Sequence, residues 1–214
     1  AAHPQSSWAA TEGRESGSYR MPAASAPSHE SSLAALPAGD DDAGKEGMEE
    51  HPGVHYLHGL FSEEALLALE REGDDVEPST SARNMFAERR FFKSSLAAGT
   101  VLKHLPKSLG LSRVLSDLRF INYPIGGFIA PHVDGVRVDD ETLLQSTTTF
   151  LLYLSTVPEG EGGETETLTK VQDGDVVKSY RPQRGSILIF PHDTPHQGAG
   201  VGNCPKSLLR GDMY

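Results

Sequence analysis

The sequence is short of cysteine, of long apolar runs and of positive charge. Its single cysteine, Cys204, cannot form an internal disulfide, which favours a reducing compartment. We therefore expect a cytoplasmic or nuclear protein, and the endoplasmic reticulum stays open if a signal has been removed. No apolar run approaches the length that crosses a bilayer, so no membrane partner is expected. The net charge of −11 argues against nucleic acid as a partner.

The first quarter of the chain also lacks side chains that could form a core. Residues 1–52 consist largely of Ala, Ser, Pro, Gly and acidic residues, and only 37% of the whole chain is hydrophobic. Such a segment cannot offset the entropy lost on ordering, so it is predicted to be a disordered tail. The remaining residues, 53–214, are enough for one domain of ordinary size.

Helix signals come early in this domain. Ser62 is a candidate N-cap, and acidic residues fill the first turn of a helix predicted to continue to Gly73. A second helix is expected over 96–105, where Pro106 ends it, and 109–118 could hold a short third. Two or three helices therefore precede the strand-rich half.

Short apolar or alternating segments, separated by Gly, Pro and Asp turns, fill the rest of the domain. Such punctuation is typical of double-sheet jelly rolls of the cupin kind, which hold ligands in the mouth of the barrel. We predict an α+β domain in which the helices pack on one face of this jelly roll. The predicted strands are 54–58, 118–123, 147–154, 175–180, 186–190 and 206–214.

One stretch carries the clearest chemistry. Residues 123–134 turn at Gly126-Gly127 and then present His132 and Asp134. Side chains two residues apart on a strand share a face, so this imidazole and carboxylate point to the same place. A third ligand would come from the apolar strand and turn at 185–196, which contains both His192 and His196. Two histidines and one carboxylate leave coordination positions open, as non-haem Fe(II) oxygen chemistry requires.

A positive charge for an acidic co-substrate would come from the last strand. Lys206 follows His196 by ten residues, and Arg210 lies on the same predicted strand face. Strand alternation alone does not separate these two cations. Lys206 could also be a solvated lysine of an edge strand.

Five motifs in order resemble the prolyl 4-hydroxylase family of Fe(II)/2-oxoglutarate-dependent dioxygenases, over roughly 120–214. The family fold is the double-stranded β-helix. The family has a Gly before its lysine where this chain has Cys204-Pro205, which puts the path of the last strand in question. The motifs are Tyr123-Pro-x-Gly-Gly-Phe-x-x-Pro-His132-x-Asp134, Tyr153-Leu-Ser155, Gly162-Gly-Glu-Thr165, His196 and Lys206-Ser-Leu-Leu-Arg-Gly-Asp212.

The resemblance implies a role for each matching residue. It makes His132, Asp134 and His196 the Fe(II) ligands and so the catalytic centre, and its spacing favours His196 over His192. Lys206, favoured over Arg210, would pair with the distal carboxylate of 2-oxoglutarate. Tyr153, on a strand facing Lys206 across the barrel mouth, would donate a hydrogen bond to that carboxylate. Tyr123 would lie near the ketoacid end. Both tyrosines could instead be core aromatics with hydrogen-bonded hydroxyls.

The activity implied by the resemblance uses dioxygen to oxidise 2-oxoglutarate to succinate and carbon dioxide while a C–H bond is hydroxylated. The substrate would be a prolyl residue in a peptide or protein, and ascorbate would keep the iron reduced. One alternative is a dioxygenase of the same fold that acts on nucleic acid or lipid. Another is a non-catalytic cupin-like module that binds a metal or a sugar, although such a module has no use for a lysine at position 206.

Other features of the sequence have simpler interpretations. His55 and His58 face opposite sides of a predicted strand, so they are interpreted as surface histidines. The charged run 88–90 is interpreted as a solvated helix or loop. The loops 74–90 and 136–145 are expected to contact the substrate, although neither contains a readable specificity motif.

Overall fold

The computed structural model describes residues 51–73, 75–80 and 85–214. The predicted tail lies outside the described residues apart from its last two positions, so the domain boundary at 52/53 stays a prediction. Within the described part of the chain, no helix is long and apolar enough to cross a membrane.

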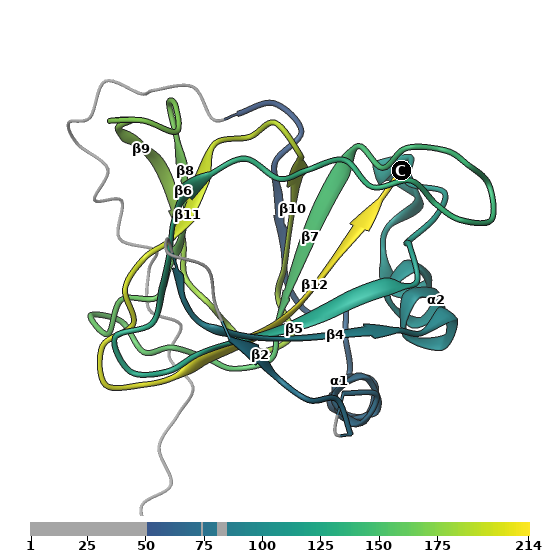
Figure 1. Ribbon diagram of the computed structural model, residues 1–214, viewed down its shortest axis with the longest axis horizontal. Helices are drawn as coiled ribbons and strands as arrows, with labels where there is room; N and C mark the ends of the chain where they lie inside the picture. Colours follow the sequence, from purple (N-terminus) through teal and green to yellow (C-terminus); the bar gives the residue numbers. More distant parts are fainter. Residues whose placement is uncertain (1–50, 74, 81–84) are drawn as a thin grey trace, which may run out of the picture. The chain divides into compact units, whose positions relative to one another are not determined.

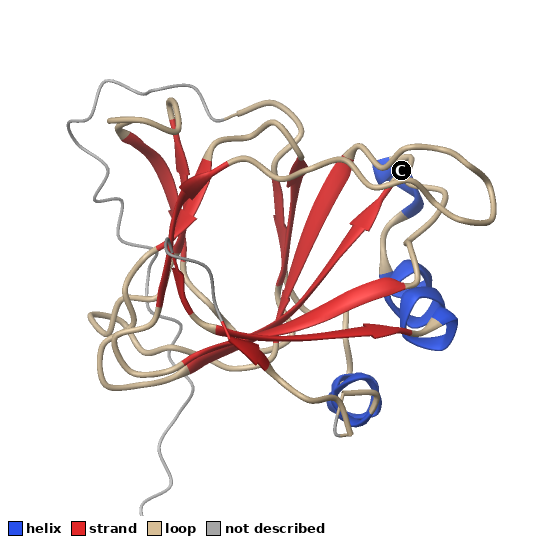
Figure 2. Cartoon of the chain, viewed as in Figure 1, coloured by secondary structure: helices blue, strands red, loops and turns tan. Residues whose placement is uncertain are grey.

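Two antiparallel sheets face each other and enclose the barrel (Figures 1 and 2). This arrangement confirms the predicted jelly roll, and the predicted strands appear with ends shifted by one or two residues. The seven-stranded sheet has the order β1 (His55–Leu57), β10 (Ile187–Pro191), β7 (Thr148–Tyr153), β12 (Lys206–Met213), β5 (Asp117–Tyr123), β4 (Glu88–Lys93) and β2 (Ser79–Thr80). The five-stranded sheet has the order β3 (Met85–Phe86), β6 (Phe128–His132), β11 (His196–Gly198), β8 (Thr165–Leu168) and β9 (Val176–Tyr180).

Two helices cover the outer face of the seven-stranded sheet. Helix α1 (Glu63–Arg71) begins at Ser62, whose hydroxyl accepts from the amide of Ala65, as the sequence predicted. Helix α2 (Ser95–His104) begins at Ser94 in the same way. The Ser94 hydroxyl also donates to the carboxylate of Glu72 at 2.6 Å, and so ties the start of α2 to the end of α1.

The seven-stranded sheet separates two buried clusters of apolar residues. On its outer face, Leu66 and Leu69 of α1 and Val101 of α2 pack against side chains such as Phe120 and Phe150. On its inner face, the second cluster fills the barrel and includes Ile121, Tyr123, Leu151, Tyr153 and Leu208. Because alternate residues of each strand face opposite clusters, inner positions are free to carry the polar groups of a site.

Three local predictions were wrong. No helix forms over 109–118: a single 3-10 turn (Lys107–Leu109) precedes the strand β5. The charged run 88–90 is part of strand β4, paired with β5, and not a helix or loop. Tyr153 does not face Lys206 across the barrel, because β7 and β12 are hydrogen-bonded neighbours in one sheet.

Candidate active site

His132, Asp134 and His196 converge at one end of the barrel. Strands β6 and β11 are paired so that His132 lies opposite His196, and the two ring centroids are 4.2 Å apart. Asp134 follows the end of β6 by two residues. One ligand atom from each residue lies within 4.8 Å of the others. The three side chains that the motif spacing selected are thus brought together.

The backbone orients both imidazoles of this triad. Nδ1 of His132 is 2.9 Å from the carbonyl oxygen of Ala130, and Nδ1 of His196 is 2.9 Å from that of Thr194. A carbonyl only accepts, so each Nδ1 carries the proton and each Nε2 keeps its lone pair for a metal. Burial lowers the pKa of His196 to about 4, which keeps its imidazole neutral near pH 7.

The seven-stranded sheet holds the carboxylate of Asp134 in place. Thr149 on β7 donates its hydroxyl hydrogen to Oδ2 at 2.6 Å, and Arg210 on β12 donates to Oδ1 at 2.7 Å. The amide of Asp134 donates to the carbonyl of His192 at 2.9 Å. The carboxylate is therefore oriented by groups from the sheet opposite the two histidines.

His192, the rival metal ligand, supports Asp134 indirectly. Its Nδ1 is 2.9 Å from the Thr149 hydroxyl and its Nε2 is 2.7 Å from that of Ser146, which accepts the Arg137 amide. Because Thr149 gives its hydrogen to Asp134, the bonds run in one direction. Arg137 donates to Ser146, Ser146 to His192, His192 to Thr149, and Thr149 to Asp134. Sequence reasoning missed this chain of hydrogen bonds.

Lys206 lies inside the barrel, away from the triad's acids. Only 1% of it is exposed, and its ammonium donates to the carbonyl of Gly163 at 2.7 Å and lies 4.4 Å above the ring of Tyr123. Among the described residues, no carboxylate is within ion-pair distance of it. Burial lowers the pKa of Lys206 to about 7. Cys204-Pro205 thus leaves the lysine side chain directed inward.

Arg210 differs from Lys206 in its partners. Its guanidinium contacts Asp134 at 2.7 Å and Asp212 at 3.2 Å, and both acids are nearly buried. Lys206 is left as the interior cation on β12 without an acidic partner in the described structure. The contacts therefore separate two residues that strand alternation could not.

The two tyrosines have different surroundings. Tyr123 pairs with Lys206 across β5 and β12, and burial raises the pKa of its hydroxyl well above the usual value. The hydroxyl of Tyr153 donates to Thr165 at 2.8 Å, so its hydrogen already has an acceptor inside the barrel. That bond is what the core-aromatic interpretation expects, and a contact of Tyr153 with a co-substrate stays a prediction.

A narrow cavity lies beside the two histidines of the triad, and Tyr123, whose ring lies under the ammonium of Lys206, forms part of its lining. Its volume of about 30 Å³ has room for about two water molecules. Side chains must therefore move before a five-carbon dicarboxylate can bind there. The lining combines aliphatic residues with polar ones: Ile121, Tyr123, Ile129, His132, Leu151, Thr165, His196, Gln197, Gly198 and Arg210.

The donor set fits the metal that the motifs imply. Two neutral imidazole nitrogens and one carboxylate, all from one end of the barrel, are the ligands that non-haem Fe(II) oxygenases use. The buried ammonium of Lys206 fits the distal carboxylate of 2-oxoglutarate.

Comparisons with known proteins bear on the family and the fold of the chain. Residues 118–210 match the family model of the 2OG-Fe(II) oxygenase superfamily. No curated protein matches the chain. The predicted resemblance to prolyl 4-hydroxylase-like Fe(II)/2-oxoglutarate oxygenases is confirmed, over residues 118–210 by the family model and in the fold by solved structures.

Solved structures share the fold at low sequence identity. A viral collagen prolyl hydroxylase from Paramecium bursaria Chlorella virus 1 is 19% identical with a TM-score of 0.55, covering 75% of this chain and 94% of that one. A Pseudomonas putida prolyl-4-hydroxylase is 20% identical with a TM-score of 0.53, covering 75% and 91%. A non-haem α-ketoglutarate-dependent epimerase of nogalamycin biosynthesis is 13% identical with a TM-score of 0.55, covering 76% and 77%.

Proposed function

We propose that this protein is an Fe(II)- and 2-oxoglutarate-dependent dioxygenase that hydroxylates a prolyl residue in a peptide or protein. The observation that carries the proposal is the placement of Lys206. It is a buried ammonium without an acidic partner in the described structure, and it lies over the ring of Tyr123, which lines the narrow cavity beside His132 and His196. A module that only bound a metal would gain nothing from burying this charge.

The three triad residues would hold the metal. Fe(II) together with 2-oxoglutarate supplies the oxidation: dioxygen, 2-oxoglutarate and R–H give succinate, carbon dioxide and R–OH. Asp134 needs little reorganisation to act as a ligand, because Thr149 and Arg210 already orient its carboxylate.

The chain's other residues would position the co-substrate and keep water out. Lys206 would pair with the distal carboxylate, with Tyr123 beside it. Tyr153 could donate to the same carboxylate only by giving up its bond to Thr165. Ile121 and Leu151 present aliphatic surface to the cavity and so favour a dry site, in which the ammonium–carboxylate attraction is stronger.

Support for a prolyl substrate comes from two structural neighbours that are named as prolyl hydroxylases. The epimerase of comparable similarity is a reminder that a shared fold leaves the reaction open. We include ascorbate in the proposal as the reductant that returns oxidised iron to Fe(II).

The proposal is tested by succinate production from 2-oxoglutarate under air with Fe(II) and ascorbate. A panel of proline-containing peptides should raise turnover, and each stimulating peptide should gain the mass of one oxygen atom. His132→Ala should abolish both signals, whereas substitution of His58, an exposed histidine outside the site, by alanine should not. If 2-oxoglutarate does not bind to the Fe(II)-loaded protein, the dioxygenase proposal fails in favour of a metal-binding module.

A further inference from the structure

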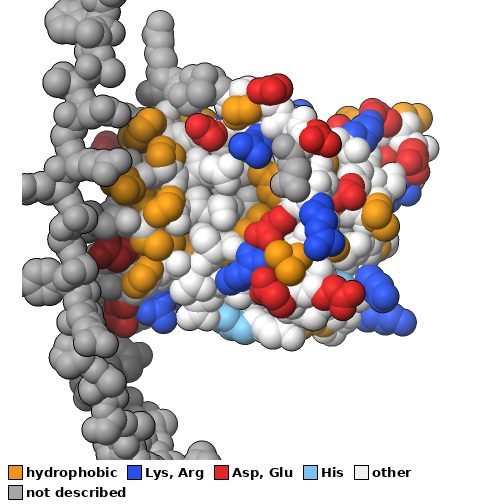
Figure 3. All heavy atoms as spheres, turned by 90° about the horizontal axis from the view of Figure 1, so that it is seen from below, with side chains coloured by type: hydrophobic (Ala, Val, Ile, Leu, Met, Phe, Trp, Pro, Cys, Tyr) orange, Lys and Arg blue, Asp and Glu red, His pale blue; other side chains and the backbone are white. Residues whose placement is uncertain are grey.

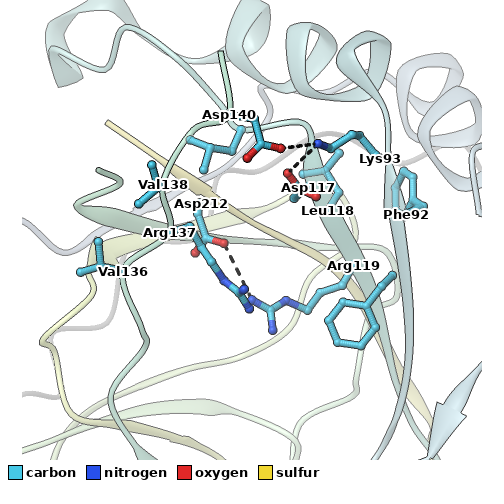
Figure 4. Close-up of a pocket in the computed structure, with 12 residues that line it drawn as sticks. Phe92, Lys93, Asp117, Leu118, Arg119, Val136, Arg137, Val138, Asp140 and Asp212 are labelled. Carbon is cyan, nitrogen blue, oxygen red and sulfur yellow. Dashed lines mark hydrogen bonds and ion pairs between the residues drawn. The ribbon is translucent and has the colours of Figure 1, made fainter. Parts of the chain in front are cut away.

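The domain has a second, larger cavity, and Figure 4 shows the residues that line it. Its volume is about 630 Å³, within the range of pockets that bind small ligands or side chains. Strands β4 and β5 form one wall, and residues 136–140, which closely follow Asp134, form another. Asp212 lines the cavity and contacts Arg210, which in turn contacts Asp134, so the cavity adjoins the proposed metal centre.

Each acidic side chain that lines this cavity has a basic partner. Asp140 and Asp117 both pair with Lys93, at 2.8 and 3.5 Å. Asp212 pairs with Arg210 at 3.2 Å. Lys93 and Arg210 therefore neutralise two of these three acidic charges without drawing on the two arginines of the lining.

The two arginines of the lining lack a close partner of their own. Arg119 comes no nearer than 3.8 Å to Asp212, too far for a hydrogen bond, although only 15% of its side chain is exposed. Arg137 forms no ion pair or side-chain hydrogen bond with any residue that the structure describes. In Figure 4 both side chains extend toward the carboxylate of Asp212, whose pKa is raised by burial although Arg210 and, less strongly, Arg137 act to lower it.

A charge count leaves one positive charge in surplus at this cavity. With a divalent metal and dianionic 2-oxoglutarate in place, Asp134 and Lys206 complete a neutral set, and Arg210 cancels Asp212. Lys93 cancels one of Asp117 and Asp140, so the charges of Arg119 and Arg137 exceed the one remaining carboxylate charge by one. Elsewhere on the protein acidic and basic side chains lie interspersed, as the face in Figure 3 shows, and the chain as a whole carries −11. The net positive charge of this cavity thus contrasts with the acidic balance of the chain.

We propose that the substrate is an acidic peptide, and that Arg119 and Arg137 bind a carboxylate close in sequence to the residue that is hydroxylated. Guanidinium groups match carboxylates with paired, charge-assisted hydrogen bonds. Phe91, Val136 and Val138, which are 49%, 56% and 53% exposed, offer apolar contact for the neighbouring parts of the peptide. This inference rests on the proposed function and adds the chemistry of the substrate.

The test uses matched proline-containing peptides in which Glu or Gln occupies each position flanking the proline. With the unmodified protein, a Glu peptide should be turned over with a kcat/KM roughly tenfold or more above that of its Gln partner. Arg119→Gln and Arg137→Gln should each reduce that ratio toward one. Arg71→Gln, which removes the same charge from an exposed position on α1, should leave the ratio unchanged.

A charge reversal sharpens the result. Arg137 is exposed on a loop, so Arg137→Glu should fold, and it should shift the preference from Glu peptides to the corresponding Lys peptides. Equal turnover of Glu and Gln peptides by the unmodified protein overturns the inference, and so does a complete lack of peptide turnover.

Binding of 2-oxoglutarate separates this inference from the function on which it rests. Anaerobic titration should give the same affinity in Arg119→Gln as in the unmodified protein. A collapse of that affinity would assign Arg119 to the co-substrate and overturn the acidic-peptide inference alone. Absence of 2-oxoglutarate binding in the unmodified protein would remove the proposed function, and the inference with it.

Discussion

The buried lysine makes 2-oxoglutarate binding depend on pH. Lys206 has a folded-state pKa of about 7, against an ordinary value of 10.5, because burial disfavours its charge. The ammonium is present below pH 7 and is lost as the pH rises through 7. Since the 2-oxoglutarate dianion binds to the ammonium form of Lys206, the apparent dissociation constant of 2-oxoglutarate should rise by a factor of about 1 + 10^(pH − 7). That is roughly twofold at pH 7 and roughly elevenfold at pH 8, compared with little change at pH 6.

The measurement is an anaerobic titration of 2-oxoglutarate into the protein saturated with Fe(II). The metal-to-ligand absorption band reports binding at pH 6, 7 and 8. Lys206→Met is the control. It should bind roughly ten- to a hundredfold more weakly at pH 6, because a charge-assisted pair is lost, and its affinity should not vary with pH. Calorimetry in buffers of different ionisation enthalpy should detect proton uptake on binding only when Lys206 is present.

Two results would refute this reasoning. A dissociation constant that stays flat from pH 6 to 8 would mean that Lys206 keeps its proton without a ligand. A pH slope that survives in Lys206→Met would place the titrating group elsewhere. Burial of Lys206 also affects the stability of the fold. Its depressed pKa destabilises the folded state below pH 7, and this destabilisation diminishes as the pH rises toward 10.5.

Three further predictions concern the metal, the core and the tail. His196→Ala should abolish stoichiometric Fe(II) binding, whereas His192→Ala should retain it; equilibrium dialysis giving the reverse order would exchange their roles. Gly211→Ala should destabilise the fold by about 1–3 kcal/mol in urea unfolding, because a Cβ there would lie 2.4 Å from the ring of Phe150; an unchanged midpoint would show that the ring moves freely. Deleting residues 1–50 should leave the thermal midpoint and 2-oxoglutarate turnover almost unchanged; a loss of several degrees would place part of the tail within the folded domain.

The elements that the sequence predicted are those with a local signal. Ser62 caps α1 because a hydroxyl at that position serves the first free amides, whatever lies elsewhere in the chain. Strand β4 was missed because neither of its faces is uniformly apolar. Arg89 and Phe91 share one face, and Arg90 and Phe92 share the other. Each face therefore mixes charged and aromatic side chains, so no apolar stripe marks this strand in the sequence.

The residues of the site also differ in whether a local sequence pattern could identify them. His132 and Asp134 could be identified from two residues of one strand, but the support of Asp134 by Thr149 and His192 joins residues 15 and 43 positions apart. No periodicity encodes such contacts. The choice between Lys206 and Arg210 likewise needed the acids that pair with Arg210, and one of these, Asp134, comes from the opposite side of the barrel.

The two ends of the proposed co-substrate site belong to different sheets, and this bears on the stiffness of the barrel. His132 and His196 lie on paired strands of the five-stranded sheet, whereas Lys206 lies on β12 of the seven-stranded one. A dicarboxylate held at both ends would link the two sheets and reduce their motion relative to each other. We therefore expect amide hydrogen exchange to slow in β6, β11 and β12 together when the co-substrate binds. Succinate is one carbon shorter than 2-oxoglutarate. When succinate replaces 2-oxoglutarate, it would link the two sheets less firmly, and product release would coincide with greater motion throughout the barrel.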